Sequence, residues 1–451
     1  MYQISCVSRV VVQKCNPGAA RLAAAVNRRS TLSLIALLLV LSAMPDTMAA
    51  PVLKDLFVDR YGATVKEAQV FMAINLLGAV AAVPLLLWWR RRADPVRMLV
   101  IASLADAVLL GLLSAPIGLW SSLAVRAAEG ITDVVVFASL FDLVRRNSGP
   151  HAARGLGLAS TPLLLGLGLG AVAGGLAAQR VAGVSDDAAS GSDVALAVFG
   201  VSALASVLVA IGALVFRRWL GGIAAVEPET GPLVASGASH AGRVPLGQLD
   251  DRPRPLLWSC VMAFFDRATG GLITTTLPLV LAGFLGYSKG QRGWLIGLPL
   301  LLMALCTGPA GALCDRVGSL RVRIAAGVVY ALAFAMIPFA ASNQAAMAVT
   351  MFAVGISAGA LFSSSLAIAA ESGGSTVALG SFRAAGDVGF FAGTTLSIIL
   401  ASAIGNEAAP GYADYASVIV LFAVAHAVST ALIAGTAVLA SRRGARINSA
   451  R

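Results

Sequence analysis

Long apolar blocks constrain the fold of this chain more than any other feature of its sequence. A helix needs roughly 20 apolar residues to cross the hydrocarbon core of a bilayer. Blocks of about that length follow one another between charged, glycine or proline residues. They give twelve predicted spans, at about 31–52, 67–89, 97–116, 119–144, 156–179, 194–216, 256–284, 293–314, 323–341, 345–370, 378–404 and 414–440.

The composition and the pattern within the blocks define the class of protein. Of the residues, 58% are hydrophobic and 12% are charged, and a soluble chain carries about twice that charged fraction. Lipid satisfies no backbone hydrogen bonds, so a spanning chain must form helices or a closed barrel. The blocks lack the alternation of barrel strands. The sequence therefore predicts an all-α integral membrane protein with twelve transmembrane helices in a lipid bilayer.

The basic residues gather in alternate loops, as at Arg90, Arg91 and Arg92, whereas the loops between them hold acidic residues such as Asp55 and Asp186. Basic loops face the cytoplasm. We therefore expect a multi-pass protein of a cell membrane, the inner membrane of a bacterium, with both termini cytoplasmic. The formal net charge of +11 follows from this topology, so we expect no nucleic-acid binding.

The first predicted span allows a second interpretation. The stretch RRSTLSLIALLLVLSAMPDTMAA has a basic start, a short apolar core and a small-residue end, as a cleaved signal peptide does. Its removal would leave eleven spans and break the repeat described next, so we favour a retained first helix.

One long polar connection, 217–254, divides the spans six and six. Its Gly, Pro and Ser content predicts a cytoplasmic linker. The expected organisation is a disordered N-terminal tail (1–30), a first six-helix half (31–216), the linker, a second half (255–440) and a basic tail (441–451).

Three landmarks suggest that the halves are copies of each other. Asp46 corresponds to Asp266, Arg97 to Arg321, and Gly155 to Gly380, at offsets of about 220 to 225 residues. Duplicated halves are an architecture that transporters use for alternating access, with the substrate near the midplane.

The most specific motif, GALCDRVGSLR, contains Gly311, Asp315, Arg316, Gly318 and Arg321. It resembles the GxLxDRxGxxR loop signature of the major facilitator superfamily, and the resemblance extends from about residue 31 to 440. It implies a cytoplasmic gating loop that faces the helix starting near Gly155. Physically, Gly318 permits a tight turn, and Asp315 can face the positive N-terminus of a neighbouring helix. An ordinary acidic turn is the alternative.

The first-half copy of this loop departs from the signature. Aligned on Arg97, it has Arg91 in place of the aspartate and Leu87 in place of the first glycine. Either Asp94 replaces this aspartate from a shifted position or the latch of the first half is weak, so we expect the cytoplasmic gate to be asymmetric.

The fourth span contains Arg126, Glu129, Gly130 and Asp133 at spacings of three and four, which put them on one helical stripe. This part resembles the RxxxG pattern of the family. Charges on one stripe of a membrane helix must face the bundle interior or a watery cavity. We interpret the stripe as a proton-coupling site, or equally as a permanently paired structural network.

The fifth span carries a glycine series, Gly166, Gly170, Gly174 and Gly175. It resembles the GxxxGPxxGG signature of the family's drug–proton antiporters, with Ala171 in place of the proline. Glycines at such spacing let helices pack closely. Generic small-residue packing is the alternative.

The first helix of each half lines the central cavity in the family, so the resemblance makes Asp46, Asp266 and Arg267 candidates for proton or substrate contact. Adjacent helical residues lie about 100° apart, so Asp266 and Arg267 are not expected to pair solely with each other. The sequence leaves open which of them touches the substrate.

Two further groups complete the prediction. Arg383 and Asp387, four residues apart, are interpreted as a gate pair, with a surface pair as the alternative. Asn75, Asp106 and His426 are isolated in the sequence, and we expect a structural or lipid-interface role for each. The cysteines form no metal-binding or redox motif.

These observations predict a secondary active transporter rather than an enzyme, with no cofactor and no metal, acting as a monomer. We expect export of a small, amphipathic solute in exchange for protons. The alternative is uptake or facilitated diffusion of a polar metabolite, with Arg267 or Arg126 binding an anionic group. A transporter-like receptor is the third hypothesis, which a large soluble extension would favour.

Overall fold

The computed structural model describes residues 17–89, 94–148, 152–182, 190–217, 219–220, 255–371, 376–405 and 410–449. Within these residues the chain forms twelve α-helices, as the apolar blocks predict. The first half contains α2 (Pro17–Met48), α3 (Val65–Trp89), α4 (Pro95–Ser114), α5 (Leu119–Ser148), α6 (Ala152–Ala182) and α7 (Gly191–Val215). The second half contains α9 (Pro255–Gly283), α10 (Lys289–Val317), α11 (Ser319–Ala340), α12 (Gln344–Glu371), α13 (Thr376–Gly405) and α14 (Tyr412–Ser449).

Eleven of the described helices contain a stretch long and apolar enough to cross a membrane. The remaining one is α5, which carries Arg126, Glu129, Asp133 and Asp142. Its charges lower its hydropathy, but it packs among spanning helices, mainly against α3 and α4.

Two helices extend beyond their predicted spans. α2 begins at Pro17, inside the expected disordered tail, and α14 continues to Ser449, inside the expected basic tail. Residues 17–30 are therefore helical, which corrects part of the predicted tail. A helix that has already nucleated adds residues at little cost. Residues 1–16 lie outside the described part of the chain, as does the linker from 221 to 254.

The two halves are copies in their local geometry as well as in their helix order. Gly62 and Gly286, which are 224 residues apart in the numbering, both have φ +64. A capping box follows each glycine. The backbone N–H groups of Thr64 and Ser288 donate to the side chains of Glu67 and Gln291 at 2.7 and 2.9 Å. This arrangement satisfies backbone donors that a helix start leaves unpaired, and it starts α3 and α10 in the same way.

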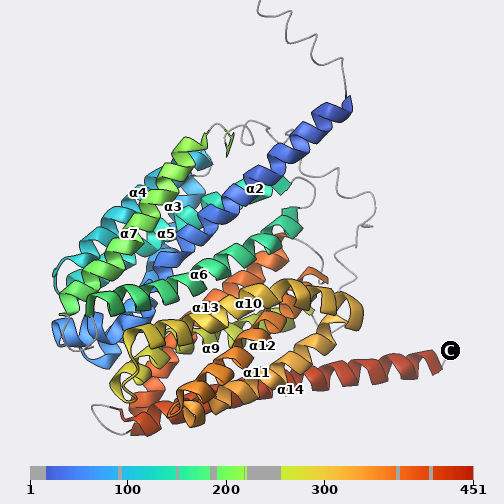
Figure 1. The fold of residues 1–451 in the computed structure, drawn as a ribbon. Helices are drawn as coiled ribbons and strands as arrows, with labels where there is room; N and C mark the ends of the chain where they lie inside the picture. Colours follow the sequence, from blue (N-terminus) through green and yellow to red (C-terminus); the bar gives the residue numbers. More distant parts are fainter. Residues whose placement is uncertain are drawn as a thin grey trace, which may run out of the picture.

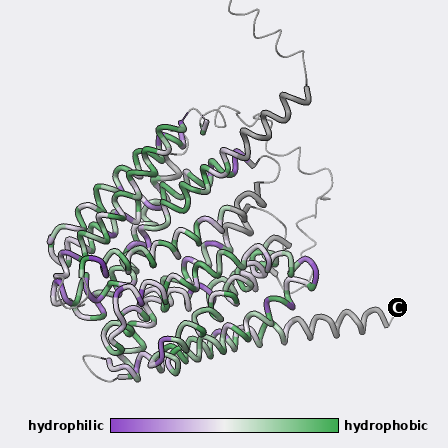
Figure 2. The backbone as a smooth tube through the Cα atoms, viewed as in Figure 1, coloured by the Kyte–Doolittle hydropathy of each residue, from purple (hydrophilic) through white to green (hydrophobic). Residues whose placement is uncertain are grey.

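Figure 1 shows the six helices of each half gathered into its own bundle, with α6 and α10 at the junction. The surface helices are apolar along most of their length (Figure 2). Their outward side chains are large and hydrophobic, for example Val108, Leu332 and Val349. Exposed apolar side chains of this kind fit a surface that lipid covers.

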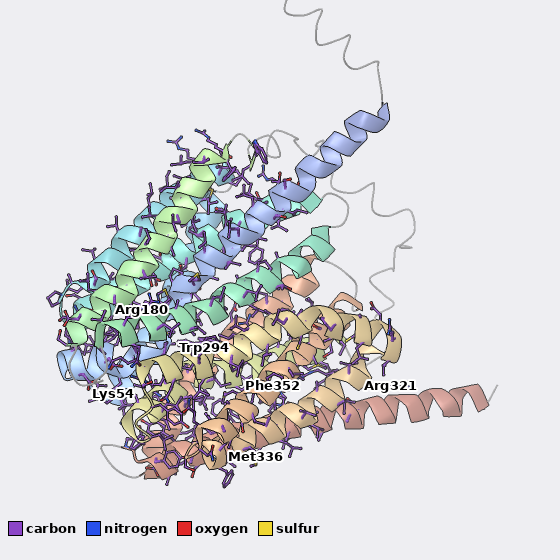
Figure 3. The ribbon with its side chains drawn as sticks, viewed as in Figure 1. Lys54, Arg180, Trp294, Arg321, Met336 and Phe352 are labelled. Carbon is purple, nitrogen blue, oxygen red and sulfur yellow. The ribbon has the colours of Figure 1, made fainter. Side chains whose placement is uncertain are left out.

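The bundle has two distinct ends. At one end of the bundle α7 finishes and α9 begins; we call it the linker end, and Arg321 lies there (Figure 3). At the other end α3 and α10 begin; we call it the joined end, and Lys54 and Arg180 lie near it. At the linker end, the first turns of α2 and the last turns of α14 extend beyond the bundle and lie far from each other (Figure 1).

Side chains connect the halves at the joined end. Asp55, in the short π-helix Lys54–Asp59 of the first half, binds Arg292 at 3.0 Å and Lys289 at 3.3 Å. Gln179 accepts a hydrogen bond from the Gly290 N–H at 3.0 Å, and Gln69 donates to Thr276 at 2.9 Å. These contacts join the two halves at this end.

Candidate functional site

Three carboxylates meet inside the first half. Asp46 of α2 and Glu129 and Asp133 of α5 place oxygens within 4.8 Å of one another. We call these three residues the carboxylate cluster. Arg126 forms an ion pair with Glu129, three residues further along α5, and both side chains are buried. The stripe expected from the spacing in the sequence therefore faces the bundle interior.

Asn75 of α3 also belongs to this site. Its Nδ2 donates to Glu129 Oε2 at 3.0 Å and to Asp133 Oδ2 at 3.1 Å. Asn75 is isolated in the sequence but not in the fold, and its hydrogen bonds fit the expected structural role rather than a lipid interface. α3 and α5 approach closely because Gly130 and Gly78 lack side chains: a Cβ at either would overlap the backbone of the facing helix.

Asp106 of α4 is also buried in the first half. Its oxygens accept hydrogen bonds from Ser206 at 2.6 Å and Thr132 at 2.9 Å. Because the side chain is buried and bonded on both sides, Asp106 occupies the structural position expected of it rather than a lipid interface.

The carboxylate cluster has a marked imbalance of charge. Within the described residues, Arg126 is the cation paired with it, and Oδ1 of Asp46 is buried without a hydrogen-bond partner. Several ionised carboxylates in a low-dielectric site repel one another, and binding a proton or a cation relieves the repulsion. The Asn75 Nδ2 group donates to one oxygen of each of two carboxylates. The cluster is therefore a place where a proton or a cation can bind.

A second buried cluster lies in the second half. Asp266 Oδ1 accepts from Arg323 Nη2 at 2.8 Å and lies 2.9 Å from His426 Nε2. Arg323 and His426 are buried, while the Asp266 side chain is 18% exposed. His426 is isolated in the sequence, but α14 brings it to a carboxylate 160 positions earlier in the chain, which fits the expected structural role rather than a lipid interface.

Asp266 and Arg267 point to different neighbours. Asp266 faces α11 and α14, through Arg323 and His426. Arg267 packs instead against α13, where a Cβ at Gly386 would lie 3.1 Å from its Cγ. The next residue, Asp387, pairs with Arg383 at 3.2 Å, and both of these side chains are exposed. The two residues thus have separate partners, as the helical geometry predicts.

The gating loop lies at the linker end. Gly318 adopts φ +100 between α10 and α11, a conformation that favours glycine. Asp315, Arg316 and Arg321 are exposed. Asp315 forms no hydrogen bond or ion pair with the part of the chain that the structure describes, so its latch role stays a prediction. Gly311 lies in the last two turns of α10 with open space beside it. Arg91 of the first-half loop lies outside the described residues.

The glycines of α6 form two faces. Gly166, Gly170 and Gly174 lie against the backbone of α2, within the first half. Gly175 instead lies against Lys289 and Gly293 of α10. The sequence did not predict this second face of α6, which also includes Gly168 and packs against Gly297 of α10. A seam of small residues therefore joins the halves.

Comparison with known proteins agrees with this architecture. The sequence profile of the Major Facilitator Superfamily matches residues 35–265 and 256–450, which together cover most of the chain. The chain belongs to this superfamily. It is therefore a multi-pass membrane protein with the fold of a secondary transporter, and membership implies a small-molecule substrate.

Solved structures share the fold. A bacterial homologue of the human lysosomal transporter Spinster, inward-facing and unoccupied, matches with a TM-score of 0.66 and 13% identity, over 92% of this chain and 97% of that one. Tetrameric PepTSo2 gives 0.63 and 13%, over 92% and 99%. The nucleoside transporter NupG gives 0.61 and 12%, over 90% and 99%. No curated protein matches the chain.

Proposed function

We propose that the protein exports a small, amphipathic solute in exchange for protons by alternating access. The observation that carries the proposal is the carboxylate cluster: three carboxylate groups within 4.8 Å of one another, beside one paired arginine. A permanent structural pair would need one carboxylate for Arg126. The other two supply sites whose charge changes when a proton binds.

The chemistry divides between the members of the cluster. Glu129 balances Arg126 through their direct ion pair. Asp46 and Asp133 then remain as neighbouring carboxylates on two different helices, α2 and α5. A proton shared between them removes one negative charge and draws the helices together, and its loss drives them apart. This links proton binding to helix position.

The junction of the halves offers a path for the movement. The seam between α6 and α10 has small residues on both sides, which permits sliding or rocking of close-packed helices. At the joined end, the pairs of Asp55 with Lys289 and Arg292 must break for that end to open. We propose that the conformation in the structure is open toward the linker end, on the cytoplasmic side of a bacterial inner membrane, with both termini cytoplasmic and the protein monomeric.

The direction of transport rests on the glycine series of α6. Gly166, Gly170 and Gly174 contact α2, the helix that carries Asp46. The series resembles the drug–proton antiporter signature, with Ala171 in place of its proline, and this resemblance is what favours export over uptake.

The test uses inside-out vesicles with an acidic interior and a panel of permanently charged amphipathic cations added outside, because these compounds carry no proton across the bilayer themselves. We expect at least one compound to enter the vesicles while protons leave. Asp133→Asn should abolish this proton release. Asp142→Asn is the matched control, because it makes the same change on α5 outside the cluster.

Three outcomes would contradict the proposal. Solute flux with no dependence on the proton gradient would remove the coupling. Proton movement in the same direction as the solute would make the protein an uptake symporter. Equal loss of activity in both variants would show that the carboxylate cluster has no special role.

A further inference from the structure

A cavity of about 400 Å³ lies between α4 and α7 at the linker end, away from the carboxylate cluster. Its lining comes from the first two turns of α4, the last turn of α7 and Arg217, two residues beyond the end of α7. The residues are Val96, Arg97, Val100, Ile101, Leu214 and Arg217. α4 and α7 pack along each other on the outside of the first half (Figure 1).

The polar part of this cavity consists of two arginines. Arg97 and Arg217 are both exposed, and neither forms an ion pair or hydrogen bond with any residue the structure describes. The nearest carboxylate along the chain, Asp94, accepts a hydrogen bond from the Val96 N–H as the cap of α4. Two guanidinium groups at one cavity are therefore left to bind an anion.

The rest of the cavity is apolar and continues onto the surface of the bundle. Ile101 is 42% exposed and Leu214 is 51% exposed. Further along the same two helices, Leu104, Val108, Leu208 and Ile211 are also exposed. An apolar track thus leads from the two arginines toward the middle of the spanning segment.

We propose that this cavity binds one anionic phospholipid. The phosphate lies between Arg97 and Arg217, and an acyl chain follows Val100, Ile101 and Leu214. Arginine binds phosphate through paired N–H donors, and basic pockets at the ends of membrane helices bind anionic headgroups. A free phosphate would use the arginines alone and would leave the apolar lining without a partner, so the lipid is the better fit.

The experiment measures retained lipid by native mass spectrometry of the full-length protein, purified in detergent and titrated with phosphatidylglycerol or phosphatidylcholine. We expect wild type to retain one phosphatidylglycerol more tightly than phosphatidylcholine. The double variant Arg97→Gln with Arg217→Gln should weaken this binding by about tenfold or more. The control, Arg316→Gln with Arg321→Gln, removes the same charge at the same end and should bind like wild type.

A second variant tests the apolar part. Leu214→Trp keeps both arginines and fills the cavity from an exposed position, so it should fold normally and lose the lipid. Unchanged binding in Leu214→Trp, together with displacement of the anion by inorganic phosphate, would show a simple anion site and overturn the proposal. Equal retention of both lipids by wild type, or full retention by the double arginine variant, would also overturn it.

Discussion

At the scale of single residues, the stability of the first half depends on the ion pair of Arg126 with Glu129, because both side chains are buried away from water. Removing one partner of a buried pair leaves an uncompensated charge, which costs about 3–5 kcal/mol. Removing both partners together leaves no such charge.

We therefore expect Arg126→Met to destabilise the protein by about 3–5 kcal/mol, and Arg126→Met with Glu129→Gln to recover a large part of that loss. Denaturant unfolding of the purified protein in detergent measures both. Additive effects of the two substitutions would contradict the assigned pair, because interacting residues are non-additive.

In the second half, two arginines have different relations to Asp266: Arg267 is next to it in the sequence, whereas Arg323 is 57 positions away. Arg323 contacts Asp266 directly and is 1% exposed, whereas Arg267 packs against α13. Arg323→Leu should cost about 3 kcal/mol of unfolding free energy, and Arg267→Leu less than about 1 kcal/mol. Equal losses, or a larger loss for Arg267→Leu, would show that Arg323 is not the main partner of Asp266.

At the scale of helices, the sequence predicts far more of the fold than of the site. Twelve helices and two halves follow from apolar length and the repeat, because each span must satisfy its own backbone. The inward stripe of α5 also follows, because spacing alone puts Arg126, Glu129 and Asp133 on one face.

The partners of these residues do not follow from spacing, because they lie on other helices. Asn75 reaches Glu129 from α3, and His426 reaches Asp266 from α14. One signal was present for Asn75: Gly78 on its own helix and Gly130 on α5 mark a close helix crossing. No feature of the sequence around His426 indicated its contact with Asp266.

The seam between α6 and α10 gives a prediction at this scale. A methyl group at Gly293 would lie 2.8 Å from the Ala171 carbonyl oxygen, whereas Gly308 on the same helix has open space beside it. We expect Gly293→Ala to slow transport by about tenfold, equivalent to about 1.4 kcal/mol on the rate-limiting step. Gly308→Ala should transport like wild type. If both variants transport normally, the seam is passive packing.

At the scale of the whole molecule, the two halves must exchange the end at which they touch. Asp55 holds two buried cations of the other half at the joined end. Asp55→Asn removes the charge that neutralises them, so the joined end should open more often. Nitroxide labels at Ser192 and Ser342, exposed positions of the two halves at this end, would report a longer distance in electron spin resonance. An unchanged distance distribution would show that the Asp55 pairs do not close this end.

The same pair of labels gives the most direct test of the central claim, that proton binding to the carboxylate cluster sets which end is open. Distances between Ser192 and Ser342 would be measured from about pH 5 to pH 8 in wild type and in Asp133→Asn. We predict two distance populations in wild type whose ratio changes with pH, and one fixed ratio in Asp133→Asn. A wild-type ratio that stays constant across this pH range would contradict the account.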